Sequence, residues 1–300
     1  GRQIGLVGCG RWGQLILRDL VQLGAVVHVA DPHPPSRDDA LTIGATSVCR
    51  AAAELPAVDG FVIAVPSSLH AEVVESVLDQ LVPIFVEKPM TVDVASARRL
   101  VESAGERIFV MDKWRYLPGV RGLRDLVRDG RLGVPQSLHT TRVQWGNPHA
   151  DVDGVWILAP HDLSIALEIF GEVPQPIAAV AHQSAGMLDL VGLLEVGAVS
   201  HHLQVSTRSS RAERRIELHG SLASAVVAGG WDNEISVYDS SSTGEQVCET
   251  ISLVGESPLL AELRAFLTHL AGGPAPVSSS QDGLRIVEAI IELRRLAGLQ

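Results

Sequence analysis

The sequence predicts an α/β protein with a doubly wound parallel sheet in its N-terminal part and a C-terminal α+β domain carrying an open, mostly antiparallel sheet. Three observations predict this arrangement. Apolar strand-like runs alternate with helical segments over residues 3–111, which is typical of a parallel sheet covered on both faces. A glycine-rich turn joins the first strand-like run to the first helix. From about residue 177 onwards, strand-like runs follow one another without helices between them, which indicates antiparallel pairing.

The N-terminal elements follow from their apolar runs and from the residues that end them. Gly24 ends the first helical segment, Asp31-Pro32 ends the second strand-like run, and Pro66 stops the third. We therefore expect strands over residues 3–7, 26–30, 60–65, 83–86 and 107–111, and helices over residues 12–23, 70–81 and 92–103.

The pattern changes near residues 112–120, where we expect the domain boundary. This gives a first domain over residues 1–117 and a second over residues 118–300. In the second we expect helices over residues 118–129, 156–170, 259–270 and 282–296, a strand over 136–145, and successive strand-like runs between 177 and about 253.

The composition excludes several classes of protein. The formal net charge is −11, from 24 basic and 35 acidic residues, which argues against nucleic acid or an anionic membrane as the partner. No apolar run is long enough to predict a membrane span, and the first residues show no secretory signal. Cys9, Cys49 and Cys248 have no metal-ligand spacing, so we expect no metal site, no disulfide framework and a reducing cytoplasm.

The basic residues are almost all arginines, since only Lys88 and Lys113 among the 24 are lysines. A coding bias explains the trend. Because ammonium and guanidinium groups are not interchangeable, the two remaining lysines are candidates for positions where arginine does not serve.

A G-x-G-x-x-G motif follows the first strand-like run and opens a helix. Gly8 allows the tight turn, Gly10 lets the backbone approach a pyrophosphate, and Gly13 lets helix and strand pack closely. The N–H groups at the start of the helix favour phosphate binding. Arg11 and Trp12 complete the predicted cofactor loop, and Arg11 either adds positive charge or lies at the surface.

Asp31 closes the second strand, 18 residues after Gly13. A carboxylate at this position accepts hydrogen bonds from the ribose hydroxyls of NAD and repels the 2′-phosphate of NADP. The alternative is that Asp31-Pro32 only opens a turn. Arg37 lies close enough in sequence to leave room for NADP. We therefore expect NAD(H) as the cofactor, in preference to NADP(H).

Three further segments resemble one protein family. They are residues 65–70 (Val65-Pro66-Ser67-Ser68-Leu69-His70), Glu87-Lys88-Pro89, and residues 282–288 (Asp-Gly-Leu-Arg-Ile-Val-Glu). With the glycine loop, they resemble the Gfo/Idh/MocA oxidoreductases over nearly the whole chain. The resemblance implies a Rossmann domain, a C-terminal substrate domain whose open sheet makes a homodimer or homotetramer, and a sugar, cyclitol or nucleotide-linked ketosugar as substrate. It also implies further cofactor contacts by Val65, Pro66, Ser67, His70, Glu87 and Lys88.

The resemblance implies two catalytic residues. Lys88 corresponds to the family lysine, whose ammonium stabilises the charge that develops on the reacting oxygen; the alternative is a surface lysine in a turn. The bond between Lys88 and Pro89 is often cis in the family. His161 corresponds to the family histidine, which exchanges the hydroxyl proton. We expect it on a helix face opposite the apolar stripe of residues 163, 166, 167 and 170.

The sequence departs from the family pattern one helical turn before His161. Many members carry an aspartate there, and this chain has Ile157. Asp162 and Glu168 are candidates for the missing acid, although Asp162 is equally consistent with an acid in the first turn of a helix. The departure puts the usual alcohol-oxidising triad in doubt and fits a ketoreductase at least as well.

The junction after the last parallel strand supplies the predicted substrate residues. Charge, aromatic rings and a hydroxyl are concentrated there and near the His161 helix, and the residues are Lys113, Trp114, Arg115, Tyr116, Trp156 and Asp162. Packing of Trp114 in a hinge between domains is the alternative.

The predicted function is hydride transfer between a nicotinamide and a carbinol or carbonyl carbon. Two alternatives stay open. One is a non-catalytic sensor that binds the dinucleotide, which only Ile157 supports. The other is an imine or biliverdin-type reductase, whose pocket would need fewer sugar-binding groups.

Overall fold

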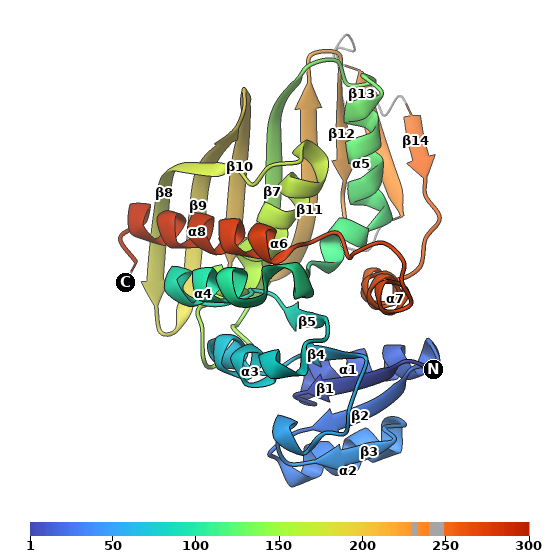
Figure 1. The fold of residues 1–300 in the computed structure, drawn as a ribbon. Coiled ribbons are helices and arrows are strands. Elements are labelled where there is room, and N and C mark those ends of the chain that lie inside the picture. The colour runs from blue at the N-terminus through green and yellow to red at the C-terminus, as the bar shows by residue number, and fades with distance from the viewer. Residues whose placement is uncertain (230–232, 240–248, 300) are drawn as a thin grey trace. The chain divides into compact units, whose positions relative to one another are not determined.

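The computed structural model describes residues 1–229, 233–239 and 249–299 of the 300-residue chain. The chain divides into two compact units (Figure 1). The first comprises Gly1–Lys113 with Ser257–Val287, and the second comprises Trp114–Glu256 with Glu288–Gln300. The first division, after Lys113, lies close to the expected boundary at residues 117/118. The return of residues 257–287 to the first unit is not apparent from the sequence pattern.

The first unit contains a six-stranded parallel sheet with strand order β3-β2-β1-β4-β5-β6, which confirms the predicted doubly wound sheet. Helix α1 packs with α2 and α7, and α3 packs with α4. Its elements are β1 (Gln3–Val7), α1 (Arg11–Gln22), β2 (Val26–Ala30), α2 (Pro34–Ile43), β3 (Ser47–Cys49), β4 (Gly60–Ile63), α3 (His70–Val77), β5 (Ile84–Glu87), α4 (Val94–Ala104), β6 (Ile108–Met111) and α7 (Pro258–Leu270).

Helix α7 belongs to the core of the first unit, although about 145 residues separate it from β6 in the sequence. Phe266 of α7 stacks on Phe85 of β5 with ring centroids 4.9 Å apart. Leu259 and Leu263 of the same helix lie in the apolar cluster formed by β1, β2 and α1. Burial of these side chains therefore fixes α7 to the sheet.

The segment beginning Asp282-Gly283 starts helix α8 (Ser280–Leu296). Ser279 N–H donates to Asp282 Oδ2 at 3.0 Å, and Asp282 N–H donates to Ser279 Oγ at 3.1 Å, a reciprocal pair that satisfies free donors at a helix start. A Cβ on Gly283 would come within 2.8 Å of Val110 Cγ2 and 3.0 Å of Met90 Sδ. Only glycine lets the helix approach β6 this closely.

The second unit contains an eight-stranded sheet with strand order β14-β13-β12-β11-β7-β10-β9-β8. Among the described residues of this sheet, only β7 and β10 pair in parallel, so the predicted mostly antiparallel sheet is confirmed. Its elements are α5 (Pro118–Arg128), β7 (Pro135–Trp145), α6 (Gly154–Phe170), β8 (Gln175–Ser184), β9 (Met187–Val196), β10 (Val199–Ser206), β11 (Arg208–Gly220), β12 (Ala223–Val227), β13 (Glu234–Asp239) and β14 (Glu249–Ser252).

Helices α5 and α6 pack on one face of this sheet. The central strand β7 shows the resulting alternation: Leu138, Thr140 and Arg142 are buried, whereas Ser137 and His139 on the opposite face are only half-buried.

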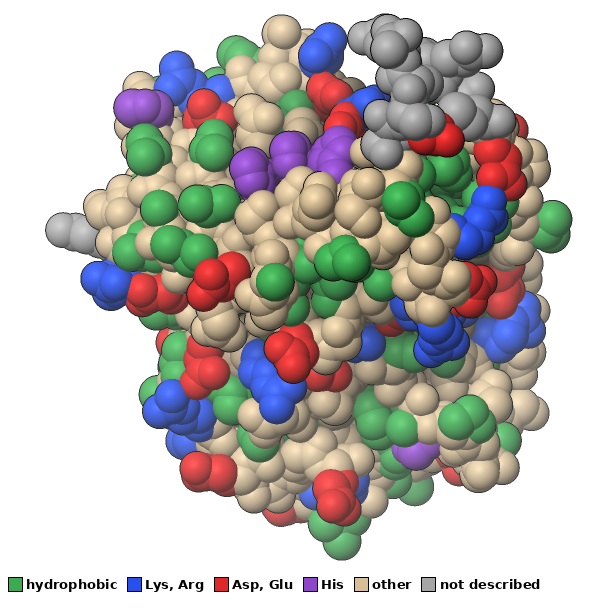
Figure 2. Space-filling model, turned by 90° about the horizontal axis from the view of Figure 1, so that it is seen from above, with side chains coloured by type: hydrophobic (Ala, Val, Ile, Leu, Met, Phe, Trp, Pro, Cys, Tyr) green, Lys and Arg blue, Asp and Glu red, His purple; other side chains and the backbone are tan. Residues whose placement is uncertain are grey.

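The opposite face carries a row of histidine side chains, which is visible in Figure 2. His139 of β7 stacks on His202 of β10 with ring centroids 4.3 Å apart, and it meets His219 of β11 edge to face at 4.8 Å. Partial burial lowers the pKa of His139, and repulsion from the two neighbouring imidazoles lowers it further.

His201 lies in the core on the other side of β10. Its Nε2 is 2.9 Å from the Thr140 hydroxyl, and no described residue forms a hydrogen bond with Nδ1. Burial, followed by repulsion from His202 and His139, lowers the pKa of His201 from 6.5 to about 3.

We expect His201 to make the folded protein less stable on acidification. Its imidazole binds a proton in the unfolded chain below pH 6.5 but stays neutral in the folded protein down to about pH 3, so stability is complete above pH 6.5 and decreases as the pH falls. At about 1.4 kcal/mol per pH unit, the loss between roughly pH 6.5 and 4.5 is about 2–3 kcal/mol. Urea unfolding of the wild type and His201→Leu at both pH values measures it. Equal losses in the two proteins would contradict this assignment.

Two further observations concern the cysteines and the length of the helices. Cys9 and Cys49 are free thiols, and Cys248 lies outside the described residues. Of the helices in the described part of the chain, none is long and apolar enough to cross a membrane.

Candidate active site

The glycine loop lies between β1 and α1, as the motif predicts. Gly8 adopts φ +91°, and a Cβ there would come within 2.6 Å of the Ala64 carbonyl oxygen. A Cβ on Gly13 would come within 2.3 Å of the Gly8 carbonyl oxygen. Gly10 differs, because a Cβ there would meet nothing within 4 Å. The fold itself therefore requires Gly8 and Gly13, whereas Gly10 leaves open space where a phosphate group can approach.

Asp31 connects the end of β2 to the glycine loop. Its Oδ2 accepts a hydrogen bond from Cys9 N–H at 2.7 Å, and its Oδ1 accepts one from His33 N–H at 2.8 Å. Burial and the negative charge of Asp31 together raise the pKa of the Cys9 thiol to about 11. The carboxylate thus lies at the sheet edge where a ribose is expected, and Arg37 donates to the Asp31 carbonyl oxygen at 2.7 Å.

The Glu-Lys-Pro turn follows β5 and is linked to the same loop. Glu87 Oε1 accepts a hydrogen bond from the Trp12 indole N–H, and Oε2 accepts one from Lys88 N–H at 3.0 Å. The Lys88–Pro89 peptide bond is cis, as expected. Burial raises the pKa of Glu87, and the positive charges of Lys88 and Lys113 oppose this.

Lys113 lies against the glycine loop within the first unit. Its Nζ is 4.0 Å from the centroid of the Trp12 ring, a cation–π geometry. The positive charges of both lysines of the chain, Lys88 and Lys113, act to lower the pKa of Glu87. Trp12 is half-buried between the Glu87 carboxylate and the Lys113 ammonium, while Arg11 is exposed.

Glu262 of α7 is a buried acid that the sequence analysis missed. It is 0% exposed, and neither oxygen has a hydrogen-bond partner among the described residues. Burial raises its pKa well above the usual range, repulsion from Glu87 and Asp112 adds to this, and Lys113 opposes it. A signal was present, because position 262 falls on the apolar stripe of residues 259, 263 and 266.

The segment after β4 differs in exposure from residue to residue. Val65 is half-buried, Pro66 is exposed and Ser67 is buried. His70, the first residue of α3, is 1% exposed, with its ring nitrogens near the carbonyl oxygens of Val65 and Pro89.

His161 lies on α6 in the second unit. The expectation that it faces away from a single apolar stripe is wrong, since α6 is buried on all sides and only Phe170 at its end is half-buried. The Asp153 carboxylate caps the helix through Val155 N–H at 3.0 Å. The His161 ring lies 6.0 Å from the Trp114 ring, centroid to centroid.

Asp162 forms a buried ion pair with Arg142 of β7. Nε and Nη2 of Arg142 both lie 3.0 Å from Asp162 Oδ1, and the guanidinium lies 4.0 Å over the Trp114 ring. Burial raises the pKa of Asp162 and Arg142 opposes it. A closed chain of contacts thus runs from His161 through Trp114 and Arg142 to Asp162, the next residue of the helix.

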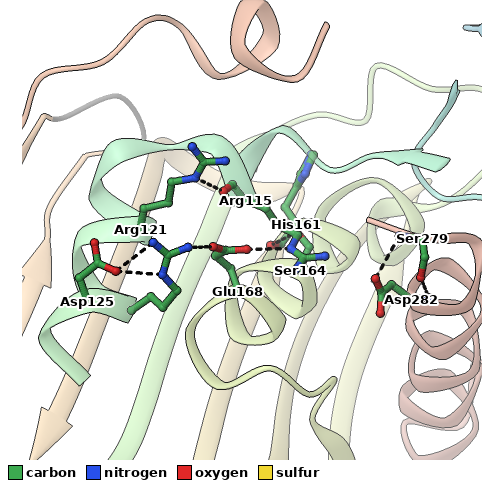
Figure 3. A network of polar contacts seen from close by, with 9 residues as sticks. Arg115, Arg121, Asp125, His161, Ser164, Glu168, Ser279 and Asp282 are labelled. Carbon is green, nitrogen blue, oxygen red and sulfur yellow. Dashed lines mark hydrogen bonds and ion pairs between the residues drawn. The ribbon is translucent and has the colours of Figure 1, made fainter. Parts of the chain in front are cut away.

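Glu168, the other candidate for the missing acid, lies between two arginines (Figure 3). Arg115 donates to Oε2 at 3.0 Å and Arg124 donates to Oε1 at 2.5 Å. Both candidate acids of α6 are therefore paired with arginines, and Arg115, an expected substrate residue, takes part in one of these pairs.

The remaining predicted residues of the second unit are buried. Ile157 is buried on α6, as is Trp156, whose ring lies 5.9 Å from the Arg294 guanidinium. Tyr116 is buried with the Arg121 guanidinium 4.8 Å over its ring.

Each unit thus gathers one group of the predicted residues. The first brings the glycine loop, Asp31, Glu87 and Lys113 to the carboxyl edge of its parallel sheet. The second places Trp114 and Asp162 around His161. The first group fits a dinucleotide, because it offers a glycine turn with open space, a helix start and a carboxylate after β2.

Comparisons with known proteins agree with this geometry. The model of the Gfo/Idh/MocA group, described as "Oxidoreductase family, NAD-binding Rossmann fold", matches residues 2–110. An inositol 2-dehydrogenase of Streptomyces avermitilis is 29% identical over 204 residues, which span 62% of this chain and 60% of that protein. A UDP-N-acetylglucosamine 3-dehydrogenase of Acidithiobacillus ferrooxidans is 25% identical, with 97% of this chain and 95% of that protein covered.

Solved structures show the same fold. Levoglucosan dehydrogenase in complex with NADH and levoglucosan superposes with a TM-score of 0.87 at 16% identity, covering 99% of this chain and 97% of that one. The Acidithiobacillus ferrooxidans UDP-N-acetylglucosamine 3-dehydrogenase superposes with a TM-score of 0.81 at 22% identity, covering 98% and 97%.

Proposed function

This chain belongs to the Gfo/Idh/MocA family of oxidoreductases, and on that premise we propose that it interconverts a secondary alcohol and a ketone of a sugar, cyclitol or nucleotide-linked ketosugar with NAD(H). The observation that carries the proposal is the hydrogen bond from Trp12 to Glu87. It joins the predicted phosphate loop to the turn that bears Lys88, so that a dinucleotide on the loop would extend towards this lysine.

The proposed reaction uses Lys88 and His161. Bound nicotinamide supplies the chemistry of hydride acceptance from, or donation to, the carbinol carbon. In the oxidative direction, His161 takes the hydroxyl proton as the C–H bond breaks. The Lys88 ammonium stabilises the negative charge that develops on the oxygen. The product is the ketone, and the reverse reaction returns the proton from His161.

The principal test is a screen of polyols with NAD⁺ and of ketosugars with NADH, using the wild type and His161→Gln. We expect turnover of at least one polyol or ketosugar by the wild type and a kcat about 10²-fold lower in His161→Gln, because the variant loses the proton acceptor. The Kd for NADH should not change. His182→Gln, at an exposed position of β8, is the matched control and should keep full activity. Tight NADH binding without turnover by the wild type would instead support a sensor.

We propose NAD(H) as the preferred cofactor because Asp31 is fixed at the end of β2. Asp31→Ser should weaken NADH binding roughly 10-fold to 100-fold, since a charged hydrogen-bond acceptor is lost, and should improve NADPH binding relative to NADH. Fluorescence titration of both cofactors measures the ratio. Asp38→Ser removes the same charge from an exposed position of α2 and controls for net charge. A wild type that binds NADPH more tightly would contradict this role of Asp31.

We also propose a homodimer or homotetramer formed through the open face of the eight-stranded sheet. Next to the histidine row, this face exposes Val180 and Val191, which are directly paired across β8 and β9. Light scattering should give a mass two or four times the 32.0 kDa of one chain, and a mass equal to that of one chain would contradict the proposal.

We also propose that the protein acts in the reducing cytoplasm, because Cys9 and Cys49 are free thiols.

A further inference from the structure

His70 forms two hydrogen bonds that a neutral histidine cannot form together. Its Nδ1 lies 2.7 Å from the Pro89 carbonyl oxygen, and its Nε2 lies 3.0 Å from the Val65 carbonyl oxygen. A carbonyl oxygen only accepts hydrogen bonds. A neutral imidazole carries one N–H and one bare nitrogen, whose lone pair would face a carbonyl lone pair. Only the doubly protonated ring donates to both.

The two carbonyl groups belong to segments that bear on the proposed chemistry. Val65 follows β4, and Pro89 belongs to the Glu-Lys-Pro turn that begins at the end of β5 and carries Lys88. Strands β4 and β5 are neighbours, with Ile63 paired to Val86. The His70 ring therefore connects the segments that follow two adjacent strands, directly beside Lys88.

Several neighbouring groups favour or disfavour a positive charge on the His70 ring. Burial and the N-terminal end of α3 disfavour it, since His70 is 1% exposed and is the first residue of the helix. The two carbonyl acceptors favour it, and Glu72 supplies a negative charge in the first turn of α3. The neighbouring turn brings one acid, Glu87, and one further cation, Lys88. Of these contributions, only the two charge-assisted hydrogen bonds, one from each ring nitrogen, require the protonated form of His70.

We propose that His70 is a buried imidazolium that holds the Lys88 turn against the end of β4, as a positioning residue for hydride transfer. The catalytic consequence rests on the proposed function, whereas the charge and the bridging role stand on the geometry of the first unit alone. In this assignment His70 acts through the turn, and its ring nitrogens serve the protein backbone.

The first test reads the protonation of the ring directly. ¹⁵N NMR of histidine-labelled protein at pH 7.5 should show both His70 nitrogens protonated, at a pH where an unperturbed histidine with a pKa of about 6.5 is mostly neutral. The His70 signals are those lost in His70→Gln, and His182→Gln serves as the matched control. One bare and one protonated nitrogen for His70 would overturn the proposal.

The second test needs no substrate and measures whether His70 holds the Lys88 turn against the end of β4. Glutamine keeps an N–H donor but offers it at one point, so it cannot span both carbonyl groups. Amide exchange over residues 84–92 should therefore be faster in His70→Gln than in the wild type and unchanged in His182→Gln. Unaltered exchange in His70→Gln would show that the ring does not hold the turn.

Turnover separates this proposal from the proposed function. With a substrate found by the screen, kcat of His70→Gln should fall roughly 10-fold to 100-fold, because the ammonium of Lys88 is displaced. A purely structural residue would lower the melting temperature and leave kcat of the folded enzyme intact, and that result would overturn the positioning role. A wild type without any turnover would count against the proposed function, while the NMR and exchange results would still decide the bridge.

Discussion

Lys88→Ala is expected to lower kcat by about 10³-fold while NADH still binds. In the reaction we propose, charge develops on the substrate oxygen, and loss of one fixed donor to such an oxygen costs roughly 10²- to 10³-fold in rate. We expect the upper end, because Lys88 supplies a full positive charge, which a neutral donor does not. Cofactor contacts by the glycine loop and Asp31 are untouched, so the Kd for NADH should change little.

Lys88→Arg is the informative companion. The chain has 22 arginines among its 24 basic residues, so arginine suits most of its basic positions. We expect the arginine variant to keep the charge and still lose most activity, because a planar guanidinium does not deliver a compact point charge at the same place. Stopped-flow measurement of NADH formation, with the Kd from fluorescence titration, tests both variants. Full activity in Lys88→Ala would refute the catalytic role.

The parallel sheet could be predicted because its strands are buried on both faces and read as continuous apolar runs. Strand β3 escaped detection because it has three residues and none of them is buried. Helix α2 was missed because it starts with two prolines and buries only Ala40. Neither element carries the periodic signal on which sequence prediction depends.

The return of α7 to the first unit could not be predicted, because it depends on a contact between Phe85 and Phe266 that local pattern does not encode. The strands of the open sheet, by contrast, could be predicted from turn signals and from the alternation of apolar and polar residues.

The glycine loop, Asp31 and the Lys88 turn could be placed from the sequence because motif and local structure coincide. The surroundings of His161 could not. Polar residues on α6 indicated an exposed face, but Arg142 of β7 and Arg115 and Arg124 near α5 neutralise the acids of this helix within the core. Such pairing between distant segments offsets the cost of burying charged groups, and that cost is what makes helical periodicity a guide to burial.

Arg142→Met should lower the free energy of unfolding by about 3–5 kcal/mol, the usual cost of leaving one member of a buried ion pair without its partner. Arg142 and Asp162 are 2% and 1% exposed, and Asp162 Oδ2 already has no hydrogen-bond partner among the described residues. The variant also removes the cation over Trp114. Urea denaturation, followed through a spectroscopic signal of the second unit, measures this change in the free energy of unfolding. Arg131→Met, which breaks an exposed pair with Glu249, is the matched control and should cost less than about 1 kcal/mol.

A double variant and a pH series separate the unpaired charge from lost packing. Arg142→Met combined with Asp162→Leu should recover most of the stability, since an apolar pair can replace a buried ion pair. In the single variant, burial raises the pKa of Asp162 without opposition from Arg142. Because a raised folded-state pKa favours the protonated acid, the deficit should be smaller at pH 5 than at pH 8. A deficit that is independent of pH and persists in the double variant would show that Arg142 stabilises the unit through packing, and that Asp162 is not a charge held by this arginine.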